Sequence, residues 1–379
     1  MITVPPEKNF VLKQNDPSEV NEIAIDAPES CGKVTDLDTF DAVKIATHHE
    51  PKNPAQVQGL IAPPAVNNQR RQAFLDSAMP AVPSASGLAS EIFPLAKDIH
   101  VNELQGSHSG NVITRLDVDG QAYVLKSVAP ARTHATLTLM QKEIRLAIWA
   151  SGASDLGPQV RAHDEIRGFF VADFVDAQYT QWDDASCEPK RSAILGALYK
   201  LHALTRLEQN RPVGNAPDVA ATNSEMARLS SQDRGGPRLR AVRQTIETLA
   251  ACLSNMSYQP VTCHGDVHGG NALYTAEKLH LIDWEQSYVG DGMEELASLA
   301  DQLGVKFAEL PKLALDYKTD NAQDILRLQL YYTIRLARRV VQGFVVMPWN
   351  ADKVRDEVID AADARLQDAL KALGIETEG

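Results

Sequence analysis

One segment of this sequence, residues 261–285, strongly limits what the chain can fold into, because polar groups recur there at fixed intervals between short apolar runs. His264 and Asp266 are followed by Asn271, five residues after that aspartate, and by Asp283, twelve residues after the asparagine. The residues just before Asp283 form an apolar run that is typical of a short buried strand. The segment therefore predicts a small β-rich insert that brings these four side chains to neighbouring turns.

Each of these residue types has a function in phosphoryl transfer. Asp266 can accept the proton of an attacking hydroxyl, and His264 can hold the catalytic loop by hydrogen bonds. Asn271 and Asp283 offer oxygen atoms, which Mg²⁺ prefers as ligands. The alternative is a hairpin whose polar residues only cap turns, and a His-x-Asp-x-x-x-x-Asn match alone does not exclude it. The apolar strand that delivers Asp283 favours the catalytic interpretation.

Further candidates for nucleotide binding lie upstream, in the order that such an enzyme would need. Gly106, Ser107 and Gly110 belong to a turn between two strand-like pieces, where backbone N–H groups can approach phosphate. Lys126 ends an apolar strand, and Glu143 follows it by seventeen residues on a predicted helix. The lysine can reach the α- and β-phosphates while the glutamate pairs with it. Taken singly, each residue is more often an ordinary turn or surface residue, so the combination carries the prediction.

Composition excludes several classes of protein. The chain of 379 residues has 37 basic and 50 acidic residues, and this formal charge of −13 argues against nucleic-acid binding. No apolar run approaches the roughly 18–20 residues of a membrane span, and the first residues do not resemble a secretory signal. Four widely spaced cysteines without metal-binding spacing indicate reduced thiols and a cytoplasmic protein.

The first part of the chain differs from the rest. Eleven of the 20 prolines fall in residues 1–94, with only four of the 22 aromatic residues, and residues 81–87 read as a linker. We expect a partly disordered extension over 1–87, or a regulatory, targeting or partner-binding segment.

The remaining chain is β-rich first and then mostly helical. A hairpin over 112–127 turns at Asp119 and Gly120, and a buried strand runs over 168–175. Helical periodicity marks residues 136–150, 188–206, 238–254, 293–303, 320–343 and 351–373. This order predicts an α+β fold with a small sheet lobe, here 88–175, and a larger helical lobe, here 176–379.

These motifs resemble the aminoglycoside phosphotransferase and choline kinase superfamily, from about residue 88 to the C-terminus. The stretch from His264 to Asn271 is similar to its catalytic loop, and Leu281-Ile-Asp283-Trp-Glu285 to its metal-binding segment. His202, in a Leu-His pair, resembles a helix end that precedes this loop. The resemblance implies a protein-kinase-like bilobal fold with an antiparallel N-lobe sheet, ATP and Mg²⁺ as cofactors, and Asp173 to Val175 as the hinge that meets adenine.

The acceptor is less closely defined. An acidic residue after the Asp-Trp pair resembles the choline and thiamine kinases, and a cationic acceptor is best held by aromatic faces and a carboxylate. The candidates are Glu285, Trp284, Tyr288, Tyr331, Tyr332 and Trp349, although each aromatic residue is also a candidate for the core.

We therefore expect an ATP- and Mg²⁺-dependent kinase of a small-molecule hydroxyl, with choline, ethanolamine or thiamine favoured. The alternatives are an antibiotic kinase of the aminoglycoside or macrolide type, and a pseudokinase or binding module that acts through the N-terminal extension. A protein kinase is disfavoured because Phe-Gly does not follow Asp283 and no Ala-Pro-Glu comes later. The sequence does not indicate the oligomeric state.

Overall fold

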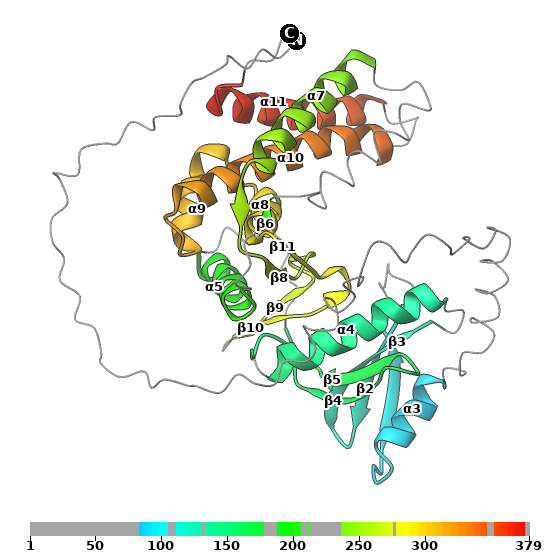
Figure 1. Cartoon of the computed structure of the whole chain (residues 1–379). Coiled ribbons are helices and arrows are strands. Elements are labelled where there is room, and N and C mark those ends of the chain that lie inside the picture. Colours follow the sequence, from blue (N-terminus) through cyan, green and yellow to red (C-terminus); the bar gives the residue numbers. More distant parts are fainter. Residues whose placement is uncertain are drawn as a thin grey trace, which may run out of the picture. The chain divides into compact units, whose positions relative to one another are not determined.

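The computed structural model describes the chain from residue 83 onward, with internal gaps (Figure 1). The described residues are 83–104, 111–129, 133–152, 154–177, 188–206, 211–212, 236–275, 278–346 and 352–375. The N-terminal extension through residue 82 lies outside them, and so do the predicted glycine turn at 105–110 and Trp349.

A five-stranded antiparallel sheet forms the first part of the described chain, which we call the sheet lobe. Its strands lie in the order β1-β2-β3-β5-β4. Two helices belong to it, α3 (Ala85–Ile92) and α4 (His134–Gly152). The strands are β1 (Ile99–Glu103), β2 (Asn111–Val118), β3 (Gln121–Val128), β4 (Val160–Asp164) and β5 (Phe169–Asp173).

Alternation along the strands separates the two faces of this sheet. Leu125, Phe169 and Val171 share a core cluster with Leu88 of α3, whereas Phe170 packs in the larger cluster that includes residues of α4. Because side chains alternate along a strand, Lys126 faces away from Leu125, toward α4. The sequence predicted that Lys126 ends its strand, but β3 continues to Val128, and the lysine is placed beneath a helix instead of in solvent.

The hairpin predicted over 112–127 is confirmed as β2 and β3. Asp119 and Gly120 both have positive φ, 47° and 85°, as a two-residue turn with matching twist requires. Residues 81–87, in contrast, are not all linker, because α3 begins at Ala85. Ser84 caps this helix, and its side chain accepts a hydrogen bond from the N–H of Gly87 at 3.1 Å. The serine that suggested a flexible linker therefore starts a helix.

Helices dominate the second part, which we call the helical lobe. They are α5 (Glu188–Leu204), α7 (Gly236–Ser254), α8 (Gly292–Gln302), α9 (Leu310–Asp316), α10 (Ala322–Val346) and α11 (Asp352–Ala372), with the 3₁₀ turns η3 (Trp284–Gln286) and η4 (Phe307–Glu309). α10 packs against α7, α8 and α11. The predicted helices are confirmed. The short helix α9 was not predicted, because a helix of only seven residues has too few turns to show a period.

Three short antiparallel ribbons complete the helical lobe. β8 (Val261–Cys263) pairs with β11 (Tyr288–Gly290), and β9 (Ala272–Tyr274) pairs with β10 (Leu279–Leu281). The third ribbon joins β6 (Arg211–Pro212) to β7 (Ser257–Tyr258). The first two ribbons position the motif residues. Residues 264–271 form the loop that connects β8 to β9, and Asp283 lies shortly after β10.

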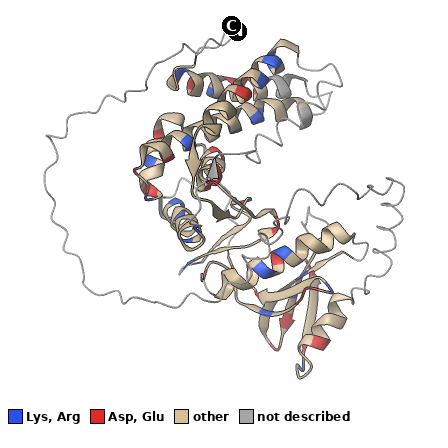
Figure 2. Ribbon diagram, in the orientation of Figure 1, with Lys and Arg blue, Asp and Glu red and all other residues tan. Residues whose placement is uncertain are grey.

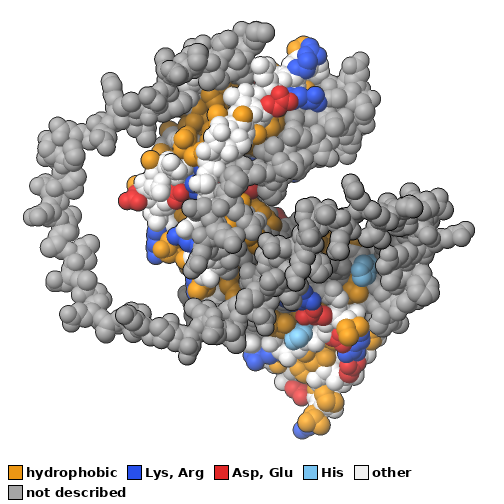
Figure 3. Space-filling view, in the orientation of Figure 1, with side chains coloured by type: hydrophobic (Ala, Val, Ile, Leu, Met, Phe, Trp, Pro, Cys, Tyr) orange, Lys and Arg blue, Asp and Glu red, His pale blue; other side chains and the backbone are white. Residues whose placement is uncertain are grey.

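The expected α+β fold, with a small antiparallel sheet followed by a mostly helical part, is confirmed. Within the described part of the chain, none of the helices combines the length and the apolar character that crossing a membrane requires. Acidic and basic residues are interspersed along these elements (Figure 2). On the face shown in Figure 3, side chains of both charges alternate with apolar ones.

Candidate active site

Lys126 lies between two carboxylates that come from distant parts of the chain. Its Nζ atom donates to Oε1 of Glu143 on α4 at 2.7 Å and to Oδ1 of Asp283, after β10, at 2.8 Å. Burial alone lowers the pKa of Lys126, but the charges of the two carboxylates raise it by more, so the amine remains a cation. The lysine thus links the sheet lobe to the segment after β10.

Three carboxylates gather around this lysine. Glu143, Asp283 and Glu285 can each present an oxygen within 4.8 Å of the others. Burial raises the pKa of Glu143 to about 7, against the attraction of Lys126, and the charges of Asp283 and Glu285 add to the rise. Oε2 of Glu143 is buried and has no hydrogen-bond partner among the described residues. This oxygen-rich, negatively charged set suits a hard divalent cation such as Mg²⁺.

The loop 264–271 folds back on itself through Asn271. The side-chain amide of Asn271 donates to the backbone carbonyl of Asp266 at 3.0 Å and to its Oδ2 at 3.2 Å. Nε2 of His268 lies 3.6 Å from the same carboxylate oxygen, and His268 lowers the pKa of Asp266. The Asp266 side chain is 44% exposed. It is therefore an ionised carboxylate that a ligand can reach.

His264 ties this loop to the strand that precedes Asp283. Its Nε2 donates to the carbonyl of Ile282 at 2.9 Å, and its ring packs on Trp284 at a centroid distance of 4.5 Å. Complete burial lowers the pKa of His264 and favours the neutral ring, whose Nδ1 can accept the backbone N–H of Asp266 at 3.4 Å. The backbone N–H of Ile282 also donates to the carbonyl of Asn271 at 2.9 Å. These contacts keep Asn271 and Asp283 close together.

Asp283 itself has an unusual backbone conformation. Its φ of 65° and ψ of 67° lie in the left-handed region, which non-glycine residues rarely occupy. Such a conformation costs about 1–3 kcal/mol and persists only where the surroundings hold it. Here the turn into η3 directs the carboxylate toward Lys126.

Behind the loop, a buried network reaches the residue before Asp266. Oε1 of Glu295 on α8 accepts the backbone N–H of Gly265 at 2.6 Å, and its Oε2 lies 2.8 Å from Nε2 of His202. The Nδ1 atom of His202 lies 2.5 Å from the hydroxyl of Tyr317. The sequence pointed to the Leu-His pair and gave no role to Glu295 or Tyr317, although Glu295 lies in the segment that follows the metal-binding motif and resembles the family there.

The remaining sequence candidates lie in different places. Gly106, Ser107, Gly110 and Trp349 fall outside the described residues. Asp173 ends β5, and its carboxylate is paired with Arg161 through two hydrogen bonds of 2.7 Å. Val175 lies two residues after Asp173, and its backbone carbonyl accepts a hydrogen bond from the N–H of Ala177 at 2.9 Å.

The aromatic candidates are mostly in the core. Trp284 is buried and packs edge-on against Trp149, and Tyr331 and Tyr332 are buried on α10. Tyr288, in contrast, is only half-buried and lines a cavity, and Glu285 accepts a hydrogen bond from Asn111 at 3.2 Å. Burial leaves Trp284 and Tyr331 no face for a ligand.

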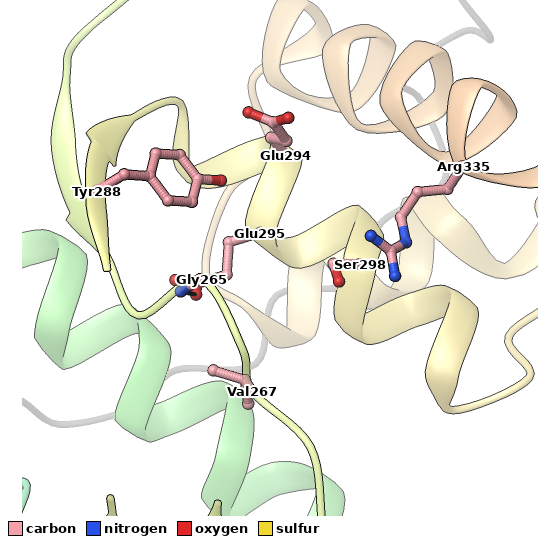
Figure 4. A pocket seen from close by; sticks show the side chains of 7 residues that line it. All are labelled: Gly265, Val267, Tyr288, Glu294, Glu295, Ser298 and Arg335. Carbon is pink, nitrogen blue, oxygen red and sulfur yellow. Dashed lines mark hydrogen bonds between the residues drawn. The ribbon is translucent and has the colours of Figure 1, made fainter. Parts of the chain in front are cut away.

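A small cavity of about 60 Å³ borders the loop on either side of Asp266. Its lining residues are Gly265, Val267, Tyr288, Glu294, Glu295, Ser298 and Arg335 (Figure 4). They come from the loop, β11, α8 and α10. Figure 4 shows Tyr288 and Glu294 on one side and Ser298 with Arg335 on the other.

An antiparallel sheet lobe with a paired lysine, followed by a helical lobe with an Asp-Asn loop and a further aspartate, defines a kinase-like phosphotransferase. The sequence profile of the phosphotransferase enzyme family matches residues 100–331, which is more than half of the chain. The chain belongs to this family, and it is an enzyme that phosphorylates hydroxyl groups of small molecules.

Solved structures of similar fold extend the comparison. The choline kinase LicA from Streptococcus pneumoniae is 16% identical, with a TM-score of 0.52, over 75% of this chain and 99% of that one. A choline/ethanolamine kinase family protein from Mesorhizobium loti is 16% identical, with a TM-score of 0.53, over 80% and 94%. An aminoglycoside phosphotransferase in complex with GDP is 14% identical, with a TM-score of 0.52, over 76% and 98%. No curated protein sequence matches the chain.

Proposed function

We propose that this phosphotransferase transfers the γ-phosphoryl group of ATP, with Mg²⁺, to a hydroxyl of a small amine-bearing molecule. The favoured acceptors are amino alcohols such as choline or ethanolamine, and thiamine. A cytoplasmic location is part of the proposal, in keeping with the free cysteines Cys252 and Cys263.

The observation that carries this proposal is the position of Lys126 between Glu143 and Asp283. A buried cation with two carboxylates, next to a second cluster of an aspartate and an asparagine, is the arrangement that phosphoryl transfer uses. The nucleotide phosphates would take the place of Asp283 at the lysine, while Glu143 keeps the lysine oriented. The backbone from Asp173 to Val175 would meet the adenine.

The catalytic loop supplies the residues for the acceptor. Asp266 would orient the hydroxyl and take its proton, since the carboxylate is ionised and partly exposed. His264 holds the loop against Ile282. Asn271 and Asp283 would hold Mg²⁺, and the metal when bound would neutralise charge on the phosphates. Positioning and charge neutralisation then provide most of the rate.

A cationic acceptor fits residues beside the catalytic loop and after β10. Tyr288, in the cavity lined by Gly265 and Val267, offers an aromatic face, and Glu285, close to Asp283, offers a carboxylate. The fold is shared with choline and aminoglycoside kinases alike, so the substrate must be decided by assay.

The test is ATP consumption by the purified protein with Mg²⁺ and a panel of choline, ethanolamine, thiamine, sugars, homoserine and aminoglycosides. Asp266→Ala should lower turnover by about a hundredfold to ten-thousandfold, the usual contribution of a general base, while ATP binding is retained. Asp320→Ala, at an exposed position of the helical lobe, is the control. Near-normal turnover by Asp266→Ala would contradict the role of this carboxylate.

A further inference from the structure

The catalytic loop holds a second histidine beside its aspartate. Nε2 of His268 lies 3.6 Å from Oδ2 of Asp266, and both side chains are partly exposed, at 36% and 44%. That separation is longer than an ordinary hydrogen bond, so the edge of the ring lies next to the carboxylate without being tightly bound to it. A group that binds in front of Asp266 therefore meets this ring as well.

The loop itself fixes the position and the tautomer of the ring. Nδ1 of His268 accepts the backbone N–H of Gly270 at 2.9 Å, so the proton of the neutral ring is on Nε2. The carbonyl of His268 accepts the N–H groups of Asn271 and Ala272 at 2.9 and 3.0 Å. A charged ring also carries a proton on Nε2, so this atom is a hydrogen-bond donor in either state.

This arrangement excludes His268 as the base of the reaction. A base needs a free lone pair, but Nδ1 is occupied by the N–H of Gly270 and Nε2 carries the proton. Asp266, an ionised carboxylate, remains the group that takes the proton of the hydroxyl. His268 can instead stabilise negative charge, which in phosphoryl transfer is spread over the oxygen atoms of the transferred group.

The distances that the reaction requires agree with this function. An acceptor hydroxyl in reach of Asp266 lies about 2.6–3.2 Å from its carboxylate, and the phosphorus that it attacks is about 3–3.5 Å from that hydroxyl. Nε2 of His268, at 3.6 Å from the same carboxylate, lies within the radius that these two steps span. The donor is therefore close enough to contact an oxygen of the phosphoryl group.

We propose that His268 is a further catalytic residue, whose Nε2–H donates a hydrogen bond to the phosphoryl group during transfer. The acceptor oxygen forms a bond to the γ-phosphorus, the bond to the bridging oxygen breaks and leaves its electron pair on ADP, and the hydroxyl proton passes to Asp266. The imidazole keeps its own proton throughout. The inference rests on the proposed function and adds a residue to the same site.

Two amide substitutions separate the functions of the two ring nitrogen atoms. His268→Asn places an amide oxygen near the position of Nδ1, where it can accept from Gly270, but leaves no donor at the position of Nε2. His268→Gln places an amide nitrogen near the position of Nε2 and loses the contact to Gly270. We expect His268→Gln to retain most of kcat and His268→Asn to lose about tenfold to a hundredfold, with little change in KM for ATP.

Turnover is measured on the full chain with ATP, Mg²⁺ and whichever of ethanolamine, choline and thiamine the wild type phosphorylates fastest. A second measurement needs no acceptor: calorimetry compares binding of ADP alone with binding of ADP, Mg²⁺ and aluminium fluoride, which mimics the planar phosphoryl group. His268→Asn should weaken the aluminium fluoride complex by about the factor lost in kcat and leave the affinity for ADP unchanged.

The matched controls are His163→Asn and His163→Gln, at an exposed position of β4, and both should behave as the wild type. Thermal unfolding shows whether each variant is folded. A merely structural function of His268 predicts the reverse order of activities, because His268→Gln is the variant that loses the contact to Gly270.

Each result has a defined meaning. Equal losses of kcat in His268→Asn and His268→Gln, or an unchanged kcat and aluminium fluoride affinity in His268→Asn, overturn the inference while the proposed function stands. A wild type that transfers phosphate to none of these alcohols, nor to sugars, homoserine or aminoglycosides, overturns both.

Discussion

Replacement of Glu295 by alanine should remove the contacts that join the catalytic loop to α8 and α5. Glu295 is fully buried, and its two oxygens serve the N–H of Gly265 at 2.6 Å and Nε2 of His202 at 2.8 Å. With the His202 proton on Nε2, Nδ1 accepts from Tyr317, so every group in this network is satisfied. Alanine leaves both donors to Glu295 without an acceptor.

The expected cost follows from these two lost contacts. The buried Nε2–H of His202 left unsatisfied costs about 1–3 kcal/mol, and the part-buried N–H of Gly265 with the vacated volume brings the loss to about 2–4 kcal/mol. Glu295→Gln should cost about 1 kcal/mol, because its amide oxygen can accept from Gly265 while a change of His202 tautomer allows the amide to donate. A typical domain stability of about 5–15 kcal/mol lets both variants fold.

Urea unfolding of the wild type and both variants measures these differences, as a shift in the midpoint at an unchanged slope. Steady-state kinetics in the same samples should show a lower kcat for Glu295→Ala, with a smaller change in KM for ATP, because Gly265 adjoins Asp266. A cost below about 1 kcal/mol for alanine, or equal costs for alanine and glutamine, would refute the proposed network.

The pH dependence gives a second measurement on the same residue. Burial raises the pKa of Glu295, but the hydrogen bond and charge of His202 lower it by more, so the folded-state pKa is below the ordinary value. A lowered pKa contributes stability above the pKa of the unfolded chain, and this is lost as pH falls through the folded value. The stability advantage of wild type over Glu295→Gln should therefore shrink in acid.

Three further substitutions test other parts of the site. Gly265→Ala should lower the midpoint of thermal unfolding and the activity, because φ is +84° and a Cβ would overlap the carbonyl of Gln286. The control is Gly196→Ala on α5, where a Cβ meets open space, and it should be neutral or stabilising. Asp283→Asn should abolish Mg²⁺-dependent transfer, and an unchanged Mg²⁺ titration would contradict its assignment. Lys126→Met should raise KM for ATP by at least about tenfold while the protein stays folded, as judged by circular dichroism, and an unchanged KM would argue against phosphate binding by this lysine.

Much of the fold was predictable where the pattern is local. The hairpin over 112–127 follows from alternation and from an Asp-Gly pair that accepts positive φ. α4, α5, α7, α8, α10 and α11 follow from helical periodicity. α3, in contrast, was hidden in a Pro- and Ser-rich stretch, since its stability comes from Leu88 and Ala89 packing on the sheet. A seven-residue α9 has too few turns to be recognised.

The same distinction applies to the site. The spacing of His264, Asp266, Asn271 and Asp283 is enough to indicate a phosphotransferase, because the motif is short and each residue type has a chemical reason. The role of Glu295 was missed, although this residue lies in the same region of sequence. Its importance depends on Gly265, thirty residues away, and a buried acid on an apolar helix is not distinguished by sequence from an exposed one.

The sequence by itself determined the class of this protein. Each strand, helix and motif is recognised from residues that lie close together along the chain, and their order then defines the class. Only the tertiary structure decided what those residues contact. Lys126 and Asp283 are 157 positions apart, and their contact depends on both lobes folding. The opposite charges of Glu294 and Arg335 meet one cavity only because α10 packs on α8. Pairing across such distances is decided by packing, which local periodicity does not encode.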